Sequence, residues 1–262
     1  MGISVRSQLQ YPASFIMSTI GHLTITGGEF FAVWALMSRF GQIGGWSLAQ
    51  VAVFYGMVSV AFALADAVTA GFDKLGTLVR HGDFDRYLLR PRSTVLQLLG
   101  YEFTLRRAGR LLQGAAVLTY GLIATAPHFG TGLLAGATAA ILLVWTIIGC
   151  AAFFVGLMMI QAALAFKTVE SIEIMNVFTY GGVQAAQYPF AIYARWFRRL
   201  FTFVVPLGAV AYYPVLSILG VADPGGAPLW VGWVSPISGF LFLVVAFLVW
   251  NAGTHWYSST GS

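Results

Sequence analysis

The sequence has few charges and a single cysteine, and both shortages restrict the class of protein. Only 9% of its 262 residues are charged and 58% are hydrophobic, whereas a soluble domain carries roughly 25% charged residues. Cys150 stands alone, so the chain can form neither an intrachain disulfide nor a multi-thiolate metal site. The apolar runs are continuous and lack period-2 alternation, which disfavours an outer-membrane barrel. The composition therefore predicts an all-α polytopic membrane protein, with residues 1–262 forming one transmembrane domain.

Motifs for nucleotide binding and hydrolysis are also missing. The chain contains no G-x-x-x-x-G-K-[ST] phosphate loop, so we expect it neither to bind nor to hydrolyse ATP in the usual way. It contains no H-E-x-x-H or G-x-S-x-G motif. The four histidines are scattered along the chain. We therefore expect no catalytic residue, no metal site and no cofactor in this chain.

The positive charge is concentrated in one segment, which runs from Gly71 to Gln113. It holds eight of the fourteen basic residues: Lys74, Arg80, Arg86, Arg90, Arg92, Arg106, Arg107 and Arg110. Lys and Arg collect on the cytoplasmic side of a membrane. We therefore interpret 72–110 as a cytoplasmic loop, and the net charge of +5 as a sign of orientation or of anionic lipid contact. It does not indicate nucleic acid.

The apolar pattern gives seven candidate membrane segments after a short interfacial entry segment at 1–12. They are 13–38, 48–71, 111–125, 132–166, 170–190, 200–220 and 232–252. Residues 132–166 exceed the ~20 residues that a crossing needs, so that helix must tilt or project. The charge rule favours placing 170–190 on the inner surface, because Arg195, Arg198 and Arg199 would then also lie inside.

A short helix is predicted inside the basic loop. Gly82 is a good helix stop, and Asp83 is an N-cap candidate for a helix of one to two turns from Phe84 to Arg90. Pro91 ends it, because the residue before a proline is pushed out of the helical region. A helix this short is unstable alone in water. Its apolar side chains therefore need a cover, which is either the bilayer surface or a groove on a partner protein.

Three runs of sequence resemble the permease subunits of type-2 ABC exporters. They are GDFDRYLLRPRS (Gly82–Ser93), YPFAIYARWFRRLFTFVVPLGAVAYYP (Tyr188–Pro214) and the tail THWYSSTGS. Within that family, the chain resembles the branch of bacterial drug/viologen-type export permeases. The resemblance covers nearly the whole chain.

The resemblance implies six transmembrane helices with both termini cytoplasmic. It implies a fifth span near 170–190 and short re-entrant external helices at about 192–222, in conflict with the charge rule at the three arginines. It also implies a coupling helix that docks on an ATPase subunit, which would bind ATP and Mg. Its residues here are Asp83, Phe84, Asp85, Arg86, Tyr87, Leu88, Leu89 and Arg90.

Ionisable groups inside spans are costly and indicate function by default. Glu29 lies in the first span, with Ser18, His22 and Thr26 at helical spacing on about the same side. We interpret Ser18, His22 and Glu29 as a candidate substrate path. The alternatives are a buried polar network between helices, or a position of Glu29 near the outer interface.

The leading hypothesis is the membrane subunit of an ATP-driven exporter in the bacterial cytoplasmic (inner) membrane. Its partners would be an ABC ATPase subunit, a second permease chain, identical or related, and membrane lipids. The cargo would be a hydrophobic or amphiphilic small molecule, including drug-like cations. The alternative is an ion- or proton-coupled transporter that works without an ATPase and uses Glu29 and Asp66 as proton carriers. An intramembrane enzyme is disfavoured, because no nucleophile–base constellation is present.

Overall fold

The computed structural model describes residues 12–99, 108–126, 133–166 and 171–257. These residues are almost entirely helical, and the one β-type pairing among them is an isolated bridge between Ile43 and Trp46. The predicted entry segment at 1–12 lies largely outside the described residues, as does the part of the basic loop at 100–107. The helices in chain order are α2 (Pro12–Phe40), α3 (Leu48–Asp73), α4 (Leu75–Arg80), α5 (Asp85–Leu88), α6 (Thr94–Leu99), α7 (Ala108–Thr125), α8 (Leu133–Ala165), α9 (Ser171–Ala186), η3 (Phe190–Ile192), α10 (Arg195–Arg199), η4 (Leu200–Val204), η5 (Gly208–Tyr212), α11 (Tyr213–Leu219), α12 (Val231–Val234) and α13 (Ile237–Thr254).

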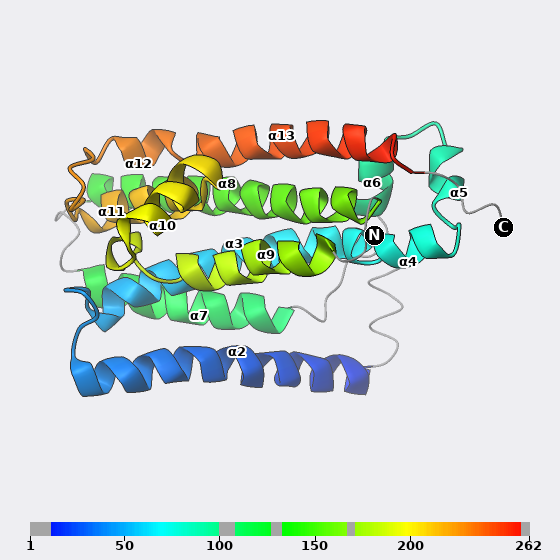
Figure 1. Cartoon of the computed structure of the whole chain (residues 1–262). Coiled ribbons are helices and arrows are strands. Elements are labelled where there is room, and N and C mark those ends of the chain that lie inside the picture. Colours follow the sequence, from blue (N-terminus) through cyan, green and yellow to red (C-terminus); the bar gives the residue numbers. More distant parts are fainter. Residues whose placement is uncertain (1–11, 100–107, 127–132, 167–170, 258–262) are drawn as a thin grey trace.

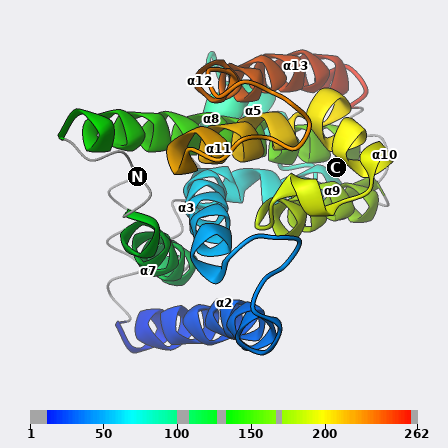
Figure 2. The ribbon, with the colours of Figure 1, turned by 90° about the vertical axis from the view of Figure 1, so that its left-hand side faces the viewer.

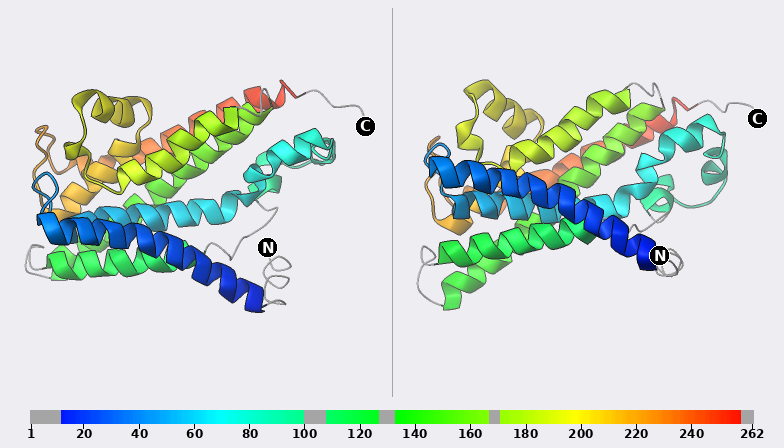
Figure 3. Two further views of the ribbon diagram at one scale, coloured as in Figure 1. Left: turned by 60° about the horizontal axis from the view of Figure 1, so that its bottom comes forward. Right: turned by 90° about the horizontal axis from the view of Figure 1, so that it is seen from below.

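The long helices lie side by side in one bundle (Figure 1). The short helices α4 and α5 project from one end, as the views in Figure 3 also show, and α10 to α12 lie at the opposite end. The start of α2 and the end of α13 both lie at the α5 end. This arrangement agrees with the prediction that the two termini share one side of the membrane.

Four helices are long and apolar enough to cross a membrane: Thr19–Phe40, Leu48–Arg80, Ala135–Ala165 and Val231–Thr254. They correspond to the predicted first, second, fourth and last spans. The predicted third and fifth spans are the helices α7, with 18 residues, and α9, with 16 described residues. Neither meets the same test over the described residues. Both still run along the bundle beside the longer helices (Figure 1).

Helix α3 lies between its neighbours in the view along the bundle (Figure 2) and is buried along most of its length. A capping box starts it: the Gln50 backbone N–H donates to Ser47 Oγ, and the Ser47 backbone N–H donates to Gln50 Oε1. Glycines then let α7 approach closely. A Cβ on Gly121 would lie 2.7 Å from the Val53 nitrogen, and one on Gly114 would lie 2.8 Å from the Ser59 Cβ. Close contact of this kind is how small residues hold membrane helices together.

The segment predicted to re-enter the membrane is a bent pair of helices. Arg195–Val204 and Gly208–Leu219 meet at 91°, with Pro206 in the break. Proline fits there because it cannot donate a helical hydrogen bond. Gly220, with φ +64°, ends the second arm. The bend is the shape of a broken span or a re-entrant loop.

Candidate functional site

The candidate docking segment is the turn of chain that carries α5. Gly82 adopts φ +72° and ends the helical run that comes from α3 and α4, which confirms it as the predicted stop. α5 itself is one turn, Asp85–Leu88, followed by Leu89 at its C-cap. The segment stands at the end of the bundle, away from α10 to α12 (Figure 1).

Two details of the predicted helix are wrong. The helix begins two residues after Asp83, and its N-cap is Phe84, with no side-chain cap hydrogen bond. Asp83 instead forms an ion pair with Arg86 at 3.8 Å, where both side chains are well exposed. The second correction concerns Phe84, which is fully buried at 0% exposure. Its ring is covered by its own chain, so it cannot be offered directly to a partner.

An aromatic cluster around Phe84 fixes the position of α5. The Phe84 ring lies 5.0 Å from Phe166, after α8, and 5.2 Å from Tyr257, after α13. Phe166 in turn lies 5.5 Å from Trp250, and Trp250 lies 5.3 Å from Phe72 on α3. These centroid distances suit edge-to-face and tilted ring pairs. The cluster therefore joins α5 to the ends of α3, α8 and α13.

Two side-chain hydrogen bonds reinforce the cluster. Tyr257 Oη donates to Asp85 Oδ1 at 2.8 Å, across 172 residues of sequence. Trp250 Nε1 donates to Thr94 Oγ1 at 3.1 Å, which ties α13 to α6. Burial and the bond to Asp85 raise the pKa of Tyr257 to about 12. The partial burial and the bond to the carboxylate thus both favour the protonated phenol.

The remaining predicted coupling residues point outward or lie at the edge. Arg86 has 81% of its side chain exposed, Leu89 is 83% exposed, and Leu88 is 45% exposed. Arg90 is exposed and lies over the Tyr87 ring, with 5.9 Å between the guanidinium carbon and the ring centroid. Arg86, Leu88, Leu89 and Arg90, which we call the outer face of α5, combine exposed apolar surface with two positive charges.

The second candidate site is a cavity of about 220 Å³ inside the bundle, where the structure places Glu29. Its lining residues come from α2, α3, α7 and α9 and the residue after α9: Glu29, Tyr55, Ser59, Arg110, Gln113, Tyr180, Val183, Gln184 and Gln187. Gln113 is 8% exposed, and within the described ranges its amide makes no hydrogen bond of good geometry, although Tyr55 lies beside it. Gln187 donates to Ser59 Oγ at 3.3 Å. Such buried polar groups call for water or a ligand.

One of the three residues of the predicted substrate path, Glu29, lines this cavity. Glu29 faces a polar cavity, which agrees with the expected wet path and is also compatible with a polar network between helices. Ser18 and His22 belong to α2, but their side chains lie outside the described part of the structure. Asp66, the other proton carrier of the alternative hypothesis, is buried at 7% exposure on α3 and does not line this cavity.

The sequence did not point to the residues that complete either site. Phe166, Trp250 and Tyr257 read as ordinary aromatic residues at the ends of apolar runs, although the tail that holds Tyr257 was part of the family likeness. Gln113 and Gln187 lie in segments whose partners are distant in sequence.

Comparison with known proteins supplies the family. The model of a family described as "ABC-2 family transporter protein" matches residues 23–261, which is nearly the whole chain. No curated protein and no solved structure matches the chain. The matched region contains the α5 segment, the aromatic cluster and the Glu29 cavity. The chain therefore belongs to the ABC-2 family of transporter proteins, as a multi-pass membrane permease.

Proposed function

We propose that this permease is the transport subunit of an ATP-driven exporter and that its ATPase docks on the outer face of α5. One observation carries the proposal. α5 is a single exposed turn, yet Phe84 packs on Phe166 at the end of α8, and Asp85 accepts a hydrogen bond from Tyr257 at the end of α13. An isolated helix of this length would be unstable. The bundle therefore stabilises α5 while leaving Arg86, Leu88, Leu89 and Arg90 for a partner.

The aromatic cluster gives the docking surface a mechanical role. ATP and Mg bind to the ATPase, and closure of two ATPase subunits moves the outer face of α5. Because Phe84 is fully buried against Phe166, a displacement of α5 also pushes the inner ends of α8 and α13. Packed interfaces respond to such a push by rigid-body motion of helices. That motion opens or closes a path between this chain and a second permease chain, identical or related.

The cargo is a hydrophobic or amphiphilic small molecule, including drug-like cations, and the membrane is the bacterial inner membrane. The apolar spans suit the hydrophobic part of such a molecule. The Glu29 cavity offers a carboxylate and several amide groups to its polar part. The exposed side of α2, which carries Phe31, Leu36 and Phe40, is the surface where a second permease chain would pack.

Co-purification tests the proposal. The tagged chain is extracted from its own cells in mild detergent, and the retained ATPase is measured by mass and by ATP hydrolysis. The Arg86→Glu/Leu89→Ala variant reverses one charge and removes one apolar contact on the outer face. Burying a leucine is worth about 1.5–3 kcal/mol, so we expect at least a tenfold loss of retained ATPase.

Leu229→Ala is the matched control, because Leu229 is also exposed but lies in the loop before α12, at the opposite end of the bundle. It should retain the ATPase. Equal retention by Arg86→Glu/Leu89→Ala would refute docking on α5. Transport that depends on a proton gradient, with no ATPase retained by the native chain, would refute the ATP-driven function itself.

A further inference from the structure

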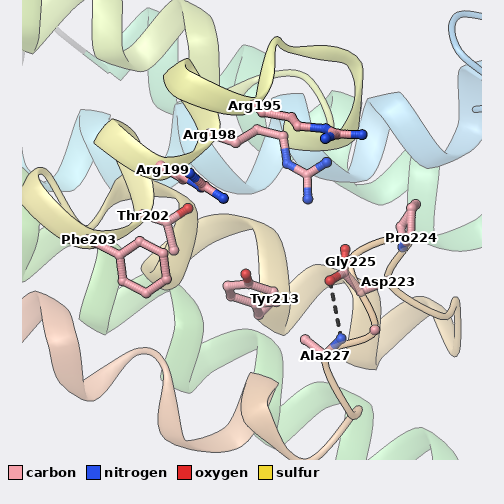
Figure 4. A pocket seen from close by; sticks show the side chains of 11 residues that line it. Arg195, Arg198, Arg199, Thr202, Phe203, Tyr213, Asp223, Pro224, Gly225 and Ala227 are labelled. Carbon is pink, nitrogen blue, oxygen red and sulfur yellow. Dashed lines mark hydrogen bonds between the residues drawn. The ribbon is translucent and has the colours of Figure 1, made fainter.

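Three arginines gather at the end of the bundle opposite α5. Arg195, Arg198 and Arg199 lie on α10 at spacings of three and four residues, which places them on one side of the helix. Figure 4 shows their guanidinium groups reaching toward the loop that contains Asp223 and Ala227. Within the described parts of the chain, none of the three takes part in an ion pair. Their mutual repulsion is therefore not offset by a carboxylate in contact.

Among the described residues around the same space, the one acidic residue is already engaged. Asp223 Oδ1 accepts a hydrogen bond from Tyr212 Oη at 3.0 Å, and Oδ2 accepts one from the Ala227 backbone N–H at 3.3 Å. Asp223 is 9% exposed, so it mainly holds the loop in place. Three arginines against one aspartate leave an excess of two positive charges around the same space.

That space is a cavity of about 570 Å³. It is lined by the three arginines, by three further residues of the bent pair (Thr202, Phe203 and Tyr213) and by the loop of 223–227. A Cβ on Gly225 would lie 2.6 Å from Asp223 Oδ2 and 3.2 Å from an Arg198 terminal nitrogen, so a side chain there would crowd the charged groups that line the cavity. Guanidinium groups form paired, charge-assisted hydrogen bonds with phosphate oxygens. The cavity has the charge and the donors to hold a phosphate group.

The rim of the cavity is apolar and exposed. It therefore favours a ligand that has a hydrophobic part as well as a phosphate over a free phosphate ion. Phe203 lines the cavity and is 81% exposed, and its neighbour Val204 is 68% exposed. Trp196, on α10 itself, is 68% exposed. Tryptophan at such positions is typical of the membrane–water interface. A ligand whose phosphate meets the arginines could therefore lay an acyl chain along Phe203 and Val204.

We propose that this arginine cavity binds the phosphate headgroup of an anionic membrane phospholipid. The location of the arginines favours an anion. They lie at the opposite end of the bundle from the basic segment. The charge rule disfavours positive residues at that end, because Lys and Arg collect on the cytoplasmic side. A bound headgroup offsets part of this positive charge and secures the bent pair of helices against the membrane surface. The proposal is independent of how the permease is powered.

Native mass spectrometry of the full chain, released from lipid nanodiscs, tests the proposal. Nanodiscs of phosphatidylcholine alone are compared with nanodiscs that also contain phosphatidylglycerol. We expect retention of phosphatidylglycerol and not of phosphatidylcholine. Each basic residue near a charged membrane strengthens binding by about 1 kcal/mol, which is roughly a fivefold change in affinity. The Arg198→Gln/Arg199→Gln variant should therefore bind phosphatidylglycerol on the order of 30-fold more weakly.

Two comparisons guard against misfolding and non-specific charge effects. Arg198→Lys/Arg199→Lys keeps the charge and should restore most of the retention. Arg39→Gln/Arg80→Gln removes two exposed charges outside the cavity and should leave retention unchanged. Equal retention of the two lipids, or loss in the Arg39/Arg80 variant alone, would overturn the site. Displacement by inorganic phosphate alone would overturn the amphiphile assignment. A chain purified from cells with a bound phosphate amphiphile that is not a phospholipid would assign the cavity to cargo and overturn the lipid source.

Discussion

Replacing Tyr257 with phenylalanine should loosen α5 while leaving its aromatic packing in place. The ring would stay beside Phe84 and Phe166, at centroid distances of 5.2 and 5.9 Å. Only the 2.8 Å hydrogen bond to the Asp85 carboxylate would be lost. The substitution therefore separates the contribution of that bond from the contribution of the aromatic cluster.

The size of the effect follows from the environment of the bond. A hydrogen bond to a charged group contributes about 1.5–3 kcal/mol. Asp85 and Tyr257 are both half-buried, and water weakens interactions that it can reach, so the lower figure applies. About 1.5 kcal/mol corresponds to roughly a tenfold change in an equilibrium. The population in which α5 has left the bundle should rise by that factor.

Hydrogen exchange of the backbone amides of α5 measures this population, because exchange from locally opened states follows the opening equilibrium. In Tyr257→Phe, the Leu89 amide, which donates to the Asp85 carbonyl at 3.1 Å, should exchange about tenfold faster. Asp85→Asn should give a smaller increase, because a neutral acceptor remains. Tyr120→Phe, on the exposed side of α7, serves as the control and should change nothing. Unaltered α5 exchange in Tyr257→Phe would refute the role assigned to the bond.

Two further predictions concern stability. Gly121→Leu would drive a side chain into the α3 backbone, since even a Cβ there lies 2.7 Å from the Val53 nitrogen; we expect a cost of about 1–3 kcal/mol, measured as a lower unfolding temperature in detergent, whereas Ala116→Leu on the exposed side of the same helix should have little effect. The pKa of Tyr257 is raised from 10.0 to about 12, so its contribution to stability should be fully present below pH 10.0 and lost as pH rises through about 12. Titration of tyrosine absorbance, compared between the native chain and Tyr257→Phe, checks this, and a Tyr257 that ionises near pH 10 would contradict the contact.

The sequence predicted the class of the protein and the places where its helices break. Continuous apolar runs identify membrane segments because each run is a local property of about twenty residues. Gly82 could be recognised as a stop because a positive φ is easy only for glycine. The prediction that Asp83 caps the helix was wrong. Phe84 is buried against other helices, and these tertiary contacts outweigh the local preference of aspartate for the N-cap position, which is worth only about 1 kcal/mol.

The two candidate sites differ in how much of each could be predicted from the sequence. The outer face of α5 lies within eight consecutive residues, so its existence was predictable, although which residues face outward was not. Phe84 and Leu89 look equally available in the sequence, yet one is 0% and the other 83% exposed. The Glu29 cavity draws on α2, α3, α7 and α9, and no local pattern could have joined them.

The sequence by itself therefore determined a membrane-embedded helical chain, its family and a short basic segment between two spans. Only the tertiary structure decided that Tyr257 bonds to Asp85 across 172 residues and that three arginines share one cavity with Asp223. The physical reason is the range of the forces. Hydropathy, helix stops and caps depend on neighbours along the chain, whereas ring packing, buried hydrogen bonds and cavities depend on which helices meet.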